Sequence, residues 1–171
     1  MIYLAEAIKL KSILRTQLHD LENELMRVAF VSKTKAEPFP EQTRTMKDVE
    51  QDLAQVRFDS RKLDALIYRA NIDHTIEFEG ETLPIVEAIE RATQLRAEAN
   101  TCKELATSET EEPMYGYGTE SAPIYRIALF DPEEYRQKAL LLEKKAHALS
   151  NKINAKNYQI ELDFNGEAYF L

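Results

Sequence analysis

The sequence predicts a mainly α-helical fold of four long antiparallel helices from two duplicated helical hairpins, with short β-strands near one end. One observation is a repeat: Asn71–Gly80, NIDHTIEFEG, returns in altered form as Asn157–Gly166, NYQIELDFNG, at an offset of 157 − 71 = 86. Another is the echo of AEAI, which starts at Ala5, in VEAI, which starts at Val86, at an offset of 86 − 5 = 81. We interpret the chain as a single domain, 1–171, with an internal duplication: residues 1–80 and 82–166 each form a helical hairpin plus a strand.

The third observation is an apolar row before each repeated stretch. Its residues step alternately by four and three, which places them on one face of a helix that packs against a partner helix. The rows are Val49, Leu53, Val56, Ser60, Leu63, Ile67 and Ala70 and, shifted by 86, Tyr135, Ala139, Leu142, Ala146, Leu149, Ile153 and Lys156. Two independent signals therefore give the same register for the duplication.

The first half is expected to begin with a helix over about residues 3–31, whose apolar stripe is interrupted at Lys11. A loop with two prolines ends this helix, because proline cannot continue a helix beyond its first turn. The second helix is expected to start near Thr45 or Lys47 and to end near residue 72. Alternating side chains over residues 75–79 then predict a short strand, followed by a glycine turn.

In the second half, Thr82 is a candidate N-cap for a helix over about residues 85–106, with Pro84 in its first turn. Four of the apolar positions of this helix hold alanine, and we expect a larger residue such as Leu14 or Leu63 to fill the space beside them. The segment after this helix, residues 108–123, is predicted to be an irregular loop.

Residues 124–130, IYRIALF, alternate enough to predict a strand or extended arm before the fourth helix. The start of that helix is well marked, because Asp131–Glu134 combines a capping acid, a proline at the first helical position and glutamates. The helix is expected to reach about residue 156. Residues 158–164 then form the second copy of the short strand, which we expect to pair with residues 75–79.

Composition excludes several classes of protein. The net charge of −8 argues against a nucleic-acid partner, since binding phosphates requires a basic face. No apolar stretch approaches the roughly 18 residues of a membrane span. The N-terminus lacks the pattern of a secretory signal, so we expect a cytoplasmic protein that does not act at a membrane. Cys102 is the single cysteine, which excludes an intramolecular disulfide.

A candidate ligand site follows from chain direction. In an antiparallel bundle, the starts of the first and third helices and the ends of the second and fourth lie together. That end gathers Glu6, its echo Glu87, Asn71 and its echo Asn157. One interpretation is a metal or small-ligand site in which the glutamates supply hard oxygen ligands. The other is structural: the glutamates complement helix dipoles and the asparagines cap helices.

No catalytic residues and no cofactor are predicted. A di-iron centre in a helical bundle requires a Glu-x-x-His motif on two helices. None of the three histidines, His19, His74 and His147, has glutamate three residues before it, so no metal ligands are assigned. Phosphate-loop, dinucleotide and nucleophile-elbow motifs are absent. The run Tyr115–Gly118, YGYG, is interpreted as an aromatic loop suited to packing on a neighbouring subunit.

Several short segments together resemble the septicolysin-like family of small bacterial proteins. They are MIYLAEA at residues 1–7, RAN at 69–71, GETL at 80–83 and NY at 157–158. The resemblance implies long helices and, from the family name, a cytolysin, but it carries no catalytic residues. Asp73 and His74 depart from the Thr and Asn of the family motif, and Tyr158 replaces its Trp, which weakens the transfer of any site at that end.

The leading hypothesis is a non-enzymatic intracellular protein that acts by self-association or by binding another protein, and a homo-oligomer is expected. It rests on the two long helical hairpins and on the aromatic-bearing loops between their helices. A membrane-active cytolysin and a metal- or ligand-binding bundle using Glu6 and Glu87 are the alternatives. The sequence leaves open whether the bundle closes within one chain or by exchange of hairpins between two.

Overall fold

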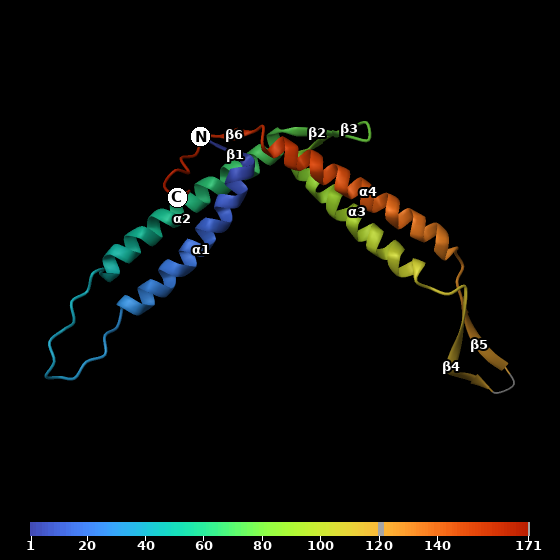
Figure 1. Ribbon diagram of the computed structural model, residues 1–171, viewed down its shortest axis with the longest axis horizontal. Helices are drawn as coiled ribbons and strands as arrows, with labels where there is room; N and C mark the ends of the chain where they lie inside the picture. The colour runs from blue at the N-terminus through green and yellow to red at the C-terminus, as the bar shows by residue number, and fades with distance from the viewer. Residues whose placement is uncertain (120–121, 171) are drawn as a thin grey trace. The chain divides into compact units, whose positions relative to one another are not determined.

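The computed structural model describes residues 1–119 and 122–170, with the side chains of residues 1–114 and 122–170. The chain is mainly helical, as expected, with short antiparallel strand pairs (Figure 1). The helices are α1 (Leu4–Val28), α2 (Met46–Asp73), α3 (Ile85–Ala106) and α4 (Pro132–Asn157). The strands are β1 (Ile2–Tyr3), β2 (Thr75–Phe78), β3 (Glu81–Pro84), β4 (Glu111–Thr119), β5 (Ala122–Ile127) and β6 (Glu161–Leu162).

The residues form two compact units. The first holds Met1–His74 together with Ala155–Leu171, and the second holds Thr75–Asn154. The chain passes from the first unit to the second after α2 and returns within the last turns of α4. The units differ from the predicted halves in their strands. β2, predicted to belong to the first half, lies in the second unit, and β6, predicted to belong to the second half, lies in the first unit. The assignment of one domain to the whole chain stays a prediction.

In the first unit, α1 and α2 run side by side in opposite directions (Figure 1). They bury one apolar stripe each, which the four-and-three spacing dictates. The buried residues include Leu4, Ala7, Leu10, Leu14 and Leu21 on α1 and Val49, Leu53, Val56, Leu63 and Ile67 on α2. Lys11 occupies one position of the α1 stripe, where its Nζ lies 2.7 Å from Asp64 Oδ1 on α2. The hydrogen bond to Asp64 raises the pKa of Lys11 and keeps its charge at the seam.

The start of α2 confirms one of the two predicted positions. Thr45 is the N-cap: its hydroxyl accepts the Asp48 N–H at 3.3 Å, and Asp48 Oδ2 accepts the Thr45 N–H at 2.9 Å. This reciprocal pair satisfies two backbone donors that the helix itself leaves free. The Thr45 hydroxyl, followed by the Thr45 N–H, lowers the pKa of the Asp48 carboxyl.

The second unit pairs α3 with α4, again in opposite directions (Figure 1). Their shared stripe is rich in small side chains: Ala88, Ala92, Leu95, Ala99, Cys102 and Ala106 on α3 and Ala139, Leu142, Ala146, Leu149 and Ile153 on α4 are buried. Ion pairs join the helices on both flanks of the stripe, between Lys138 and Glu98 at 2.9 Å and between Lys103 and Glu143. The helix pair of this unit is therefore held by a narrow apolar contact and a polar border.

A tight hairpin joins β2 to β3 in the second unit. Glu79 and Gly80 both have positive φ, +50° and +85°, which a two-residue hairpin turn of this kind requires. The non-glycine residue at this strained position is held in place, because the Glu79 carboxylate lies 2.7 Å from Lys145 Nζ on α4. Lys152 Nζ also donates to the Glu77 carbonyl at 2.8 Å. The hairpin is thus fastened along α4.

Three expectations about strands and caps are wrong. Residues 75–79 do not pair with residues 158–164: β2 pairs with β3, since the two-residue turn brings them together, and β6 pairs with β1. Thr82 is not a helix cap, because it lies within β3 and its hydroxyl donates to Glu77; α3 begins at Ile85, as predicted, and its N-cap is Pro84. The loop predicted after α3 is largely strand β4, which pairs with β5.

The predicted start of α4 is confirmed, with the Glu133 N–H donating to Asp131 Oδ1 at 2.9 Å.

The C-terminal segment packs on the first unit. Gly166 is buried, and a Cβ there would lie 3.1 Å from Ile2 Cγ2 and from the Phe170 ring, which is tighter than ordinary contact. The Tyr169 hydroxyl donates to Asp59 Oδ2 on α2 at 2.6 Å. Burial, followed by this hydrogen bond and the charge of Asp59, raises the pKa of Tyr169 to about 12. The segment is thus attached to α2 through a protonated phenol.

Replacing Leu149 by alanine should lower the free energy of unfolding by about 3 kcal/mol, through lost burial and the cavity left behind. Leu149 is fully buried, whereas Leu141, two turns earlier on the same helix, is 54% exposed. Leu141→Ala is the matched control and should change stability by no more than about 0.5 kcal/mol. Urea unfolding followed by circular dichroism measures both variants, and equal losses would contradict the position of the seam on α4.

Attachment of the C-terminal segment should weaken at high pH. The folded pKa of Tyr169 lies above the unfolded value of 10.0, so its stabilising effect is complete below pH 10 and is lost as the pH rises through about 12. Tyrosinate absorbance of the wild type minus that of Tyr169→Phe should show one phenol titrating near pH 12. In Asp59→Asn this titration should move toward pH 10, and an ordinary titration in the wild type would contradict the hydrogen bond.

Candidate functional site

Glu6 has a structural partner. It lies half-buried in the first turn of α1, and its Oε2 accepts the backbone N–H of Tyr3 at 2.8 Å. One oxygen of the carboxylate is therefore occupied with a backbone donor that precedes the helix, as in half of a capping box. Its echo Glu87 lies exposed in the first turn of α3, where a negative charge complements the helix dipole.

The two asparagines differ from each other and from the predicted role of helix caps. Asn71 is half-buried in the last turn of α2, but the residue that caps this helix is His74, whose N–H donates to the Ala70 carbonyl at 3.2 Å. Asn157 lies in the last turn of α4 and is 7% exposed. Its Oδ1 has no hydrogen-bond partner among the described residues. Asn157 is thus a buried polar side chain with one free acceptor.

Glu6, Asn71 and Asn157 belong to the first unit, and Glu87 belongs to the second. The four-residue site therefore stays a prediction. Within the described part of the chain, no three or more His, Cys, Asp or Glu side chains are grouped so that they could hold a metal ion. His19 and His74 make local contacts with Asn23 and the Ala70 carbonyl, respectively.

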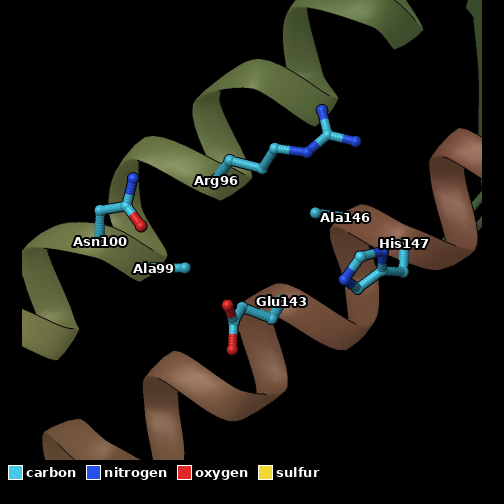
Figure 2. A pocket seen from close by; sticks show the side chains of 6 residues that line it. All are labelled: Arg96, Ala99, Asn100, Glu143, Ala146 and His147. Atoms are coloured by element: carbon cyan, nitrogen blue, oxygen red, sulfur yellow. The ribbon is translucent and has the colours of Figure 1, made fainter.

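A groove between α3 and α4 was not foreseen. Its central cavity, of about 230 Å³, is lined by Arg96, Ala99 and Asn100 from α3 and by Glu143, Ala146 and His147 from α4. In Figure 2 the two alanines face each other across the gap and the four polar side chains surround it. The Arg96 guanidinium donates to the Ser150 hydroxyl across the groove.

Two further cavities, of about 180 and 290 Å³, continue the groove toward either end of the helix pair. All three open on the same face, because their rim residues step by three and four along both helices. The rims are Ile89, Thr93, Arg96, Asn100, Lys103 and Thr107 on α3 and Asn154, Ser150, His147, Glu143, Leu140 and Arg136 on α4. We call this feature the α3–α4 groove.

Small residues create the groove. Ala92, Ala99 and Ala106 from α3 form its floor with Ala139, Ala146 and Ile153 from α4. Leu14 and Leu63, which we expected to fill this space, are buried and belong to the first unit, so their position beside the alanines stays a prediction. The alanines at alternating seam positions were the sequence signal for the groove. Alanines in one helix predict close helix approach, whereas a groove also requires small residues in the facing row of α4.

No family model matches the chain, and no curated protein matches it. A solved structure is similar: the "Crystal structure of a functionally unknown conserved protein from Corynebacterium diphtheriae". It shares 25% sequence identity and a TM-score of 0.64, and the alignment covers 95% of this chain and 99% of that one. In the described residues, no helix is long and apolar enough to cross a membrane. The similarity extends along almost the whole fold.

If Glu6 is structural, Glu6→Ala should lower the free energy of unfolding by about 1 kcal/mol, since the Tyr3 N–H loses its acceptor. Glu87→Ala is the matched control, and it should cost only a few tenths of a kcal/mol. Urea unfolding measures both. Metal analysis of the purified wild type and of the double variant gives the second readout, and metal present only in the wild type would instead establish a site.

Proposed function

We propose that this chain is a duplicated, non-enzymatic helical protein of the cytoplasm that acts by self-association or by binding another protein. The observation that carries this proposal is the β4–β5 arm, Glu111–Ile127, in which every described side chain is exposed. An isolated two-stranded ribbon is at best marginally stable in water. A ribbon of this length with no layer packed on it is suited to be covered by a partner.

The strand registers support the duplication. In the second unit Ile76 lies opposite Leu83, and in the first unit Leu162 lies opposite Ile2. Adding the offset of 86 to Ile76 gives Leu162, and subtracting the offset of 81 from Leu83 gives Ile2. The offset of 86 came from the repeated stretch that contains Ile76 and Leu162, and the offset of 81 came from helical segments. Neither offset used the pairing of the strands, and the observed registers fit two copies of one unit.

Exposed apolar residues mark the arm and its base. Leu129 is 96% exposed and Ile127 is 61% exposed, and Ile124, Tyr125 and Met114 are exposed as well. The loop end of the α1–α2 pair shows the same feature with Met26, Phe30 and Phe39. Clustered exposed apolar residues are typical of interaction surfaces. The same end of both helix pairs is therefore suited to association.

The accessible surface also favours a partner. The chain exposes 12607 Å². Two separate compact domains, each of half its mass, would expose roughly 10,400 Å² in total. The two units, taken separately, expose at least as much surface as the whole chain. Their accessible surface therefore exceeds that of two compact domains of the same mass, however the units are arranged. Burial of such an excess against a second chain is the ordinary means of stabilising thin helical layers.

The resemblance to septicolysin-like proteins supports a second candidate, a membrane-active cytolysin. Exposed apolar residues along the helices, among them Ile8, Ile13 and Val86, would supply the lipid-facing side. Release of dye from liposomes by micromolar protein tests this candidate, and absence of release sets it aside. A ligand site at Glu6 and Glu87 is the third candidate and depends on the metal analysis above.

Self-association predicts a concentration-dependent mass. Sedimentation equilibrium over a range of protein concentrations should give a species of at least twice 19.7 kDa at the upper end. Replacing Glu111–Ile127 by a short glycine-serine linker should shift the equilibrium toward monomer, since the exposed apolar surface is lost. A strict monomer at every concentration, with no protein that co-purifies in stoichiometric amount, would overturn the proposal.

A further inference from the structure

We propose that the β4–β5 arm of one chain lies along the α3–α4 groove of a second copy, so that a dimer forms by reciprocal exchange of arms. The inference rests on the proposed self-association and names its surfaces. Both surfaces belong to the second unit, Thr75–Asn154.

The side chains along the α3–α4 seam are smaller than those along the α1–α2 seam. The echo at an offset of 81 places Leu18, Leu21 and Leu25 of α1 where α3 has Ala99, Cys102 and Ala106. Three of the described cavities follow the α3–α4 seam, where these side chains are small. A hollow that a neighbouring copy fills recovers the contacts that small side chains give up.

The arm and the groove have matching lengths. The groove rim runs from Ile89 to Thr107, about 27 Å at roughly 1.5 Å per helical residue. Strand β4 has nine residues, roughly 30 Å when extended. The arm leaves the loop end of α3 and α4 and extends away from the helices (Figure 1). The arm therefore does not lie along the groove of its own chain, and we assign the groove to the arm of a second copy.

The charges of the two surfaces are complementary. The groove rims carry Arg96, Lys103 and Arg136, of which Lys103 pairs with Glu143 and Arg136 pairs with Glu133 on α4. Arg96 therefore supplies the net positive charge of the groove. The arm sequence, residues 111–127, carries three glutamates against Arg126, in a protein with a net charge of −8. Arg96 makes its cross-groove hydrogen bond to a hydroxyl, that of Ser150, so its charge is available to a carboxylate of the partner. Opposite charges across an interface favour this pairing over others.

Reciprocal exchange closes the assembly. Each copy offers one arm and one groove, so a twofold axis places both arms on both grooves and leaves neither surface free. The arm also gains a layer against its apolar side chains, including Ile124 and Tyr125, which are exposed in the single chain. Formation of the dimer thus covers both the β4–β5 arm and the α3–α4 groove.

Charge reversal on either surface tests the proposal. The groove variant combines Arg96→Glu with Arg136→Glu, and the arm variant combines Glu111→Lys with Glu112→Lys. Each variant alone should raise the dissociation constant of the dimer by about tenfold or more, because like charges then face each other. The control combines Arg91→Glu with Lys144→Glu, two exposed residues outside the groove rims, and should leave the dissociation constant unchanged.

The decisive measurement is an equimolar mixture of the groove and arm variants. In the mixed dimer the acidic arm meets the basic groove, and the basic arm meets the acidic groove, so association should return to near the wild-type value. Sedimentation velocity measures all samples, with circular dichroism to establish that each variant is folded. A wild-type dimer that neither variant weakens, or variants whose mixture stays monomeric, would overturn arm exchange and leave self-association standing. A wild type that is monomeric throughout would overturn both.

Discussion

The single apolar seam between paired helices is the constraint on which the rest of the structure depends. A pair of helices can bury only one stripe on each, so every other face remains in contact with water or with whatever covers it. The buried seam residues step by three and four along most of each helix, and few other helical positions are buried. Stability in this architecture therefore comes from length along the seam rather than from the thickness of a core.

That constraint explains the parts that surround the helices. A short hairpin, β2–β3, lies along α4 of the second unit, where Lys145 and Lys152 fasten it. In the first unit the C-terminal segment lies on α2, where Tyr169 reaches Asp59. Adding 86 to Asp59 gives Lys145, so the two fastenings use corresponding positions. Each pair is thus covered on one flank by a segment that follows a helix, while the α3–α4 groove lies on the opposite flank from Lys145.

Local signals in the sequence predicted the helices well and the strands poorly. Thr45 and Asp131 begin helices through bonds to residues two or three positions away, and such short-range chemistry is visible in a single sequence. Strand pairing depends instead on which segments the chain path brings together. The expected pairing of residues 75–79 with 158–164 failed because Glu79 and Gly80 turn the chain immediately. The candidate site shows the same difference between local and long-range contacts. The partner of Glu6 is the Tyr3 N–H, three residues earlier in the sequence. The position of Glu87 relative to Glu6 depends instead on how distant segments are arranged. The α3–α4 groove could not be predicted from one helix alone, because its depth depends on the side chains of α3 and α4 together.

The pairing of β6 with β1 has a consequence for biosynthesis. The first unit joins residues that are far apart in the sequence, since Leu4 donates its N–H to the Ile160 carbonyl and Ile2 lies opposite Leu162. During translation, residues 75–154 emerge before Glu161 and Leu162, so the β1–β6 pair of the first unit can form only after the second unit has been synthesised. The second unit is therefore contiguous in the sequence, whereas the first unit is completed by a segment that is synthesised after it.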